Sequence, residues 1–124
     1  MGFYTVINCI DGRVQIPVIR YIQDRFNVEY VDLITEPGPD LILSEQEDIA
    51  AVDSILNRVN ISIEKHGSHG IAIAGHYDCA ANPAPESEHV VQLNISVDFL
   101  KSRYPGMEII GLWVDRTWKV REIV

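Results

Sequence analysis

The stretch Gly70-Ile71-Ala72-Ile73-Ala74-Gly75-His76-Tyr77-Asp78-Cys79 decides the fold, because a short apolar run stops abruptly at polar residues. Such a run predicts a strand over residues 70–75 that is covered on both faces, as in a parallel sheet. The N-terminus repeats the pattern, since the predicted strand Phe3–Asn8 is followed by Cys9-Ile10-Asp11-Gly12-Arg13. The two cysteines of the chain therefore each follow a predicted strand.

The rest of the chain alternates between helical and extended patterns. Apolar residues at helical spacing predict helices, and short apolar or alternating runs predict strands. Ser44 and Glu47 match a capping box, which predicts the start of the middle helix. Prolines and glycine predict a loop over Glu36–Asp40, whereas Leu41–Leu43 is too short to assign. The further helices are expected at 14–26, 44–65 and 86–103, and the further strands at 28–35, 108–114 and 118–124.

This βαβαβαββ order predicts a three-layer α/β fold in which residues 1–124 form a single domain. We expect a mostly parallel sheet, in an order beginning 2-1-3-4, with helices on both faces and a C-terminal antiparallel edge strand. Connections then leave the first and third strands in opposite directions, and open α/β sheets bind ligands at such a switch point. The topology therefore predicts that Cys9 meets His76 and Cys79 there.

The composition excludes several classes of protein. A net charge of −8 without a basic cluster argues against a nucleic-acid partner. No apolar run approaches the roughly 20 residues that span a bilayer, and no export signal is visible, so we expect a cytoplasmic protein without a membrane partner. Two cysteines in such a protein favour metal binding or reactivity over a disulfide.

Two thiolates and one imidazole, from Cys9, His76 and Cys79, match a catalytic zinc site with an open fourth position. Asp11 and Arg13 add a carboxylate and a cation beside it. Simpler interpretations remain open, because free cysteines are often small buried hydrophobes, Asp11 suits a helix N-cap, and Arg13 suits an exposed surface. His89 is not assigned to the site and is expected on a solvated helix face.

Cys-x-Asp-x-Arg followed by Gly-His-x-x-Cys resembles the paired signature of the β-class carbonic anhydrases. The resemblance implies that Cys9, His76 and Cys79 bind Zn²⁺, and that zinc-bound hydroxide reversibly hydrates carbon dioxide to bicarbonate. Asp11 would orient the hydroxide and Arg13 would hold Asp11. In some members the aspartate is instead a fourth zinc ligand. The family also implies a homodimer whose neighbouring subunits wall the pocket, and the apolar segments Leu41–Leu43 and 16–22 favour one.

The chain departs from this signature at several positions, which indicates a short, divergent member. Gly12 replaces the usual serine, Ala80 replaces a glycine, and Thr35–Asp40 replaces an arginine-asparagine-alanine-glycine stretch. Three hypotheses follow. The chain is a carbonate dehydratase-like zinc lyase, or a hydrolase of carbonyl sulfide or carbon disulfide with the same site. Alternatively, it is a zinc-containing binding or regulatory module without turnover. The third hypothesis is a metal-free thiol protein.

Overall fold

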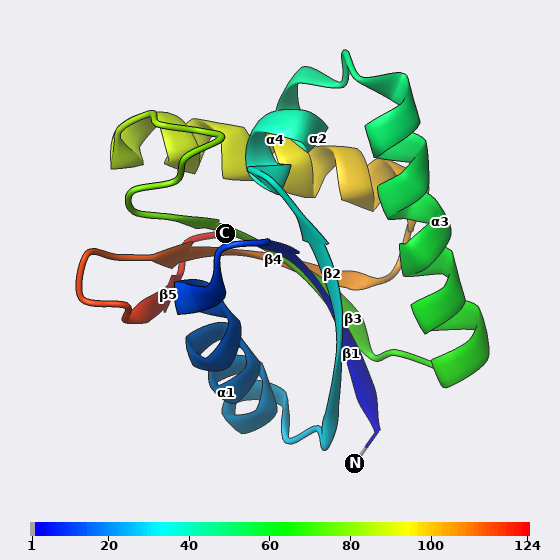
Figure 1. The fold of residues 1–124 in the computed structure, drawn as a ribbon. Coiled ribbons are helices and arrows are strands. Elements are labelled where there is room, and N and C mark those ends of the chain that lie inside the picture. Colours follow the sequence, from blue (N-terminus) through cyan, green and yellow to red (C-terminus); the bar gives the residue numbers. More distant parts are fainter. Residues whose placement is uncertain (1) are drawn as a thin grey trace.

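A five-stranded sheet forms the middle of the molecule, and the computed structural model describes residues 2–124 (Figure 1). Its spatial order is β2-β1-β3-β4-β5, with the first four strands parallel and β5 antiparallel to β4. This arrangement confirms the predicted sheet order and the antiparallel edge strand. The strands are β1 (Phe3–Cys9), β2 (Tyr30–Glu36), β3 (Gly70–His76), β4 (Glu108–Val114) and β5 (Val120–Glu122).

Helices cover both faces of the sheet, as the sequence predicts (Figure 1). A short 3-10 turn, η1 (Gly12–Val14), leads into α1 (Gln15–Phe26), which packs on one face. The opposite face carries α2 (Pro39–Glu45), α3 (Ile49–His66) and α4 (Glu86–Arg103). None of the helices within residues 2–124 combines the length and apolarity that crossing a membrane requires.

The alternation of side chains along β3 separates two hydrophobic cores. Ala72 and Ala74 belong to the core beneath α1, together with Val18 and Ile22 of that helix. Ile71 and Ile73 point the other way, into the core formed with α3 and α4. Successive strand residues face opposite sides of a sheet, so a continuous apolar run serves both cores at once.

Several element boundaries differ from the predicted ones, and three of the differences have a clear physical reason. The expected loop Glu36–Asp40 ends early, because α2 begins at Pro39, a residue whose fixed φ suits a first helical turn. The predicted capping box is wrong: Ser44 lies inside α2, and Asp48 caps α3 by accepting a hydrogen bond from the Ala51 amide. The last strand is shorter than residues 118–124, since Trp118 lies in the turn before β5.

The topology brings the ends of two sequence-distant strands together. β1 pairs with β3, so the carboxyl ends of both strands meet at one edge of the sheet. The chain leaves β1 for α1 on one face, and it leaves β3 for α4 on the other. This is the switch point predicted from the element order.

Candidate metal centre

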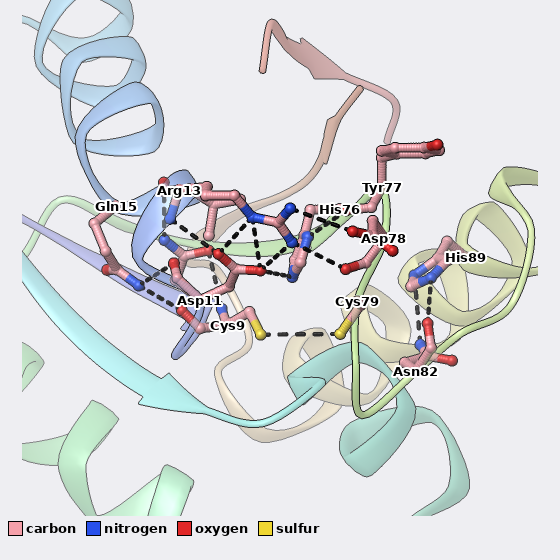
Figure 2. Close-up of polar contacts among 12 residues, drawn as sticks. Cys9, Asp11, Arg13, Gln15, His76, Tyr77, Asp78, Cys79, Asn82 and His89 are labelled. Carbon is pink, nitrogen blue, oxygen red and sulfur yellow. Dashed lines mark hydrogen bonds and ion pairs between the residues drawn. The ribbon is translucent and has the colours of Figure 1, made fainter. Parts of the chain in front are cut away.

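Cys9, His76 and Cys79 converge at the switch point (Figure 2). Cys9 is the last residue of β1, and His76 is the last residue of β3. Cys79 lies in the loop that follows β3. Adjacent parallel strands place their ends side by side, which explains why residues so far apart in sequence meet here.

The three side chains form a compact donor set that could hold a metal ion. Their ligand atoms all lie within 4.8 Å of one another, and the two sulfurs are 3.9 Å apart. Two sulfurs bound to one tetrahedral zinc ion would lie about 3.8 Å apart, given Zn–S bonds of about 2.3 Å. The side chains are also buried, with at most 4% of each residue exposed. Their spacing and chemistry therefore fit zinc.

His76 presents the correct nitrogen to the two sulfurs. Its Nδ1 lies 2.7 Å from the Tyr77 carbonyl oxygen, which can only accept a hydrogen bond, so Nδ1 carries the proton. Nε2 then has a free lone pair, and it is buried without a hydrogen-bond partner. An unpaired buried polar atom is costly unless something binds it. A histidine ligand held by such a backbone contact is the usual arrangement at a metal site.

The cluster favours one thiolate even without a metal. Hydrogen bonding from the Cys79 thiol lowers the pKa of Cys9, and the backbone amides of Gly38 and Asp11 contribute. The resulting negative charge on Cys9 raises the pKa of Cys79, since a second thiolate beside the first is unfavourable. Burial lowers the pKa of His76, but the neighbouring Cys9 thiolate, the Tyr77 carbonyl oxygen and the Asp11 carboxylate together outweigh burial and raise that pKa. A divalent cation would compensate for the charge of both thiolates.

Asp11 and Arg13 form a bidentate pair beside this donor set. Arg13 Nε lies 3.0 Å from Asp11 Oδ1, and Nη2 lies 2.7 Å from Oδ2. The guanidinium hydrogen bonds lower the pKa of Asp11 to about 2, so this carboxylate is ionised at neutral pH. Asp11 Oδ2 is 4.0 Å from His76 Nε2, which places the carboxylate at the edge of the candidate metal site. Asp11 also caps η1 by accepting from the Arg13 amide, so the N-cap interpretation holds as well.

Three further residues support this loop without belonging to the predicted metal or catalytic set. Asp78 binds Arg13 through its carboxylate at 3.2 Å and through its carbonyl oxygen at 3.1 Å. The Trp118 ring lies 4.6 Å from the guanidinium carbon of Arg13. Gln15 donates to the carbonyl oxygens of Cys9 and Asp11. Gln15, four residues beyond Asp11 at the start of a predicted helix, was the one detectable signal.

A small pocket opens next to the donor set. Its volume is about 160 Å³, and it includes both Cys9 and Asp11 in its wall. Apolar residues form the rest of the wall, namely Ile10, Pro37, Ala80 and Ala81. A pocket of this size suits a very small molecule rather than a cofactor or a peptide.

His89 contradicts its expected position on a solvated helix face. It is completely buried and lies between Asp40 and Asn82. The expected exposure is wrong because His89 lies four residues before Leu93, which is buried on the same side of α4. Its partner Asp40 belongs to α2, whereas the sequence predicted a loop at that position.

Comparisons with known proteins give a consistent picture. A family model described as "Putative carbonic anhydrase" matches residues 1–124. No curated protein matches the chain in sequence. Among solved structures, the chain is similar to one of two tetrameric β-carbonic anhydrases from the filamentous ascomycete Sordaria macrospora. The TM-score is 0.61 at 11% identity, and the match covers 99% of this chain and 81% of the other.

A second solved structure is the β-carbonic anhydrase CafA of the fungal pathogen Aspergillus fumigatus. Here the TM-score is 0.49 at 11% identity, with 98% of this chain and 76% of the other covered. At such low identity, the Sordaria match shows that the two chains share a fold.

Proposed function

Because this chain belongs to the family of putative carbonic anhydrases, we propose that it is a zinc-dependent lyase that reversibly hydrates carbon dioxide to bicarbonate. One observation carries the proposal: two thiols and an unpaired imidazole nitrogen converge within 4.8 Å at the edge of a small pocket. Three protein ligands leave the fourth position of a tetrahedral zinc ion for a water, which is typical of catalytic sites.

Cys9, His76 and Cys79 are the proposed zinc ligands. Zinc, when bound, supplies Lewis acidity that makes water a nucleophile near neutral pH, as is known for carbonic anhydrases. The Cys9 and Cys79 thiolates compensate for two positive charges, and the Tyr77 carbonyl fixes the ring orientation of His76. Such thiolate ligands stay reduced in the cytoplasm, which is where we place the protein.

Asp11 is the proposed orienting carboxylate. It is ionised, reaches the pocket wall and lies 4.0 Å from the ring nitrogen of His76 that faces the donor set. It can accept a hydrogen bond from the attacking water and so aim the oxygen lone pair at carbon dioxide. Arg13 binds both carboxylate oxygens, which prevents Asp11 from turning onto the metal as a fourth ligand.

The apolar part of the pocket suits the proposed substrate. Carbon dioxide is small and carries no net charge, and Ile10, Pro37, Ala80 and Ala81 offer a surface that does not compete with carbon dioxide for hydrogen bonds. Carbonyl sulfide and carbon disulfide share these properties, so they are the substrates to assay if carbon dioxide fails.

Stopped-flow hydration of carbon dioxide by the zinc-loaded protein tests the proposal. We expect catalysis by the wild type with one zinc per chain, and a roughly 10²-fold or greater loss in Asp11→Asn, because orientation contributes at least that much. Zinc content is measured in both proteins. A wild type that binds zinc without hydrating carbon dioxide would instead support the binding-module hypothesis, and a wild type that binds no zinc would exclude the metal site.

A further inference from the structure

A buried polar cluster behind the Cys79 loop has no part in the proposed chemistry. It consists of Asp40 from α2, Asn82 from the loop, and His89 from α4. We propose that these three side chains are positioning residues that hold the Cys79 turn and thereby set the affinity and ligand geometry of the metal site. This inference rests on the zinc site of the proposed function.

The cluster is a closed ring of hydrogen bonds. Asp40 Oδ2 lies 2.5 Å from His89 Nδ1, and His89 Nε2 donates to the Asn82 carbonyl oxygen at 3.0 Å. Asn82 Nδ2 donates hydrogen bonds to Asp40 Oδ1 at 3.0 Å, which closes the ring, and to Gln92 Oε1 at 2.7 Å. Asn82 is therefore held through its side chain and its backbone at once (Figure 2).

The ring is polar although it is fully enclosed. Asp40 is 1% exposed and His89 is 0% exposed. The carbonyl oxygen of Asn82 can only accept, so His89 Nε2 carries a proton, and one further proton lies between His89 Nδ1 and Asp40. Removing one member of such a buried pair leaves its partner uncompensated, which is strongly destabilising for the local arrangement.

Asn82 in turn restrains the backbone at Cys79. The Asn82 amide donates to the Cys79 carbonyl oxygen at 3.3 Å, which closes a turn over the two intervening alanines. Fixing Asn82 therefore fixes the turn that carries the Cys79 sulfur.

A second ligand, His76, is connected to the same ring. Gly38 caps α2, two residues before Asp40, and a Cβ at Gly38 would lie 3.2 Å from Asn82 Cβ. Gly75 precedes His76, and a Cβ at Gly75 would overlap Asp40 Oδ2 and lie 3.0 Å from His89 Nδ1. The ring thus packs directly against the strand that carries His76, and this contact requires glycine.

Metal binding by Asp40→Asn and Asn82→Ala tests the inference. Zinc affinity is measured by competition with a chromophoric chelator, and the Co²⁺-loaded proteins report the thiolate-to-metal absorption bands. We expect roughly tenfold or greater loss of zinc affinity in both variants and a shift of those bands. The matched control is Thr5→Val. This variant removes the buried hydrogen bond between Thr5 in β1 and Ser62 in α3, which is not part of the ring.

The control separates positioning from simple stability. Thr5→Val is expected to lower the melting temperature while leaving zinc affinity and the Co²⁺ spectrum unchanged. If Asp40→Asn does not fold, Asn82→Ala carries the test, because Asn82 lies in a loop and keeps its backbone contacts. Folded ring variants with wild-type affinity and spectrum would overturn the inference. A wild type that binds neither ion would overturn the zinc site itself.

Discussion

The guanidinium of Arg13 is held on three sides. It forms a bidentate pair with Asp11, contacts both the carboxylate and the carbonyl oxygen of Asp78, and lies over the Trp118 ring. A planar, rigid cation is needed for all three contacts at once, and lysine offers no such fork. Arg13 therefore fixes the carboxylate plane of Asp11 relative to the donor set.

Arg13→Ala is expected to reduce carbon dioxide hydration by roughly 10²-fold without loss of zinc, because the freed Asp11 carboxylate can turn onto the metal and take the position of the water. Activity and zinc content are measured together. The matched control is Arg25→Ala, since Arg25 also pairs with a carboxylate, that of Glu122, and also lies over an aromatic ring, that of Phe26. Equal losses in the two variants would contradict a specific role of Arg13.

Acid titration tests the charge state of Asp11. Pairing with Arg13 lowers its pKa from 3.8 to about 2, so the folded state gains stability above pH 3.8 and loses it as the pH falls through about 2. Asp11→Asn keeps a cap acceptor but removes the charge. We expect this variant to have a lower melting temperature than the wild type near neutral pH, and the difference in melting temperature to vanish toward pH 2.

These melting curves are recorded on metal-free protein, so that zinc release in acid does not contribute. Asp24→Asn, at an exposed carboxylate of α1, serves as the control and is expected to melt close to the wild type throughout. A constant difference between Asp11→Asn and the wild type across this range would contradict the pairing.

At the residue scale, the sequence predicted which side chains meet but not how they are held. Cys9 and His76 were identifiable because each ends an apolar run in a topology that places the two ends together. His89 and Asp40 were not, because their partners come from separate helices and no local spacing reports such a contact. Arg13 was identified, whereas its contact with Trp118 depends on the turn between β4 and β5.

The start of α3 shows the same limit at the scale of an element. Ser44 and Glu47 have the spacing of a capping box, but Ser44 is within α2 and bonds to the Leu41 carbonyl oxygen. The actual cap, Asp48, is a residue type equally suited to that position. The polar residues that separate two adjoining helices carried both patterns, so the sequence placed the start of α3 at a residue that belongs to α2.

Asp48→Ala is expected to lower the free energy of unfolding by about 1 kcal/mol, because the Ala51 amide loses its acceptor. Glu47→Ala is the matched control, an exposed neighbour expected to change stability by less than about 0.5 kcal/mol. Urea denaturation of both variants measures the difference. A larger loss of stability in Glu47→Ala than in Asp48→Ala would contradict this cap and support the capping box predicted from the sequence.

The elements themselves were predictable because packing and periodicity agree along most of the chain. The apolar run of β3 supplies both cores, and α3 places its apolar stripe on the sheet. The helix ends at His66 and is capped by Gly67, whose φ is +64°. The helix α2 was missed because it has only seven residues, too few to establish a helical period.

At the scale of the whole molecule, the candidate site lies at an open edge. Ile10 lines the small pocket and is 63% exposed, and Ile16, on the other side of Asp11 and Arg13 in the sequence, is 59% exposed. The segment Leu41–Leu43, in contrast, contributes Leu43 to the core, and Ile22 is buried as well. The apolar surface that favours a dimer is therefore beside the site, not on α2.

We expect a symmetric homodimer that covers this surface, since Ile10 and Ile16 are both exposed beside the candidate site. Sedimentation at micromolar concentration should give the mass of two chains. Ile16→Glu should weaken association by about tenfold or more, because burying an unpaired charge is costly. Ile61→Glu is the matched control, as Ile61 is 57% exposed on α3, across the sheet from α1. A wild-type monomer, or equal weakening by both substitutions, would show that this edge is not the interface.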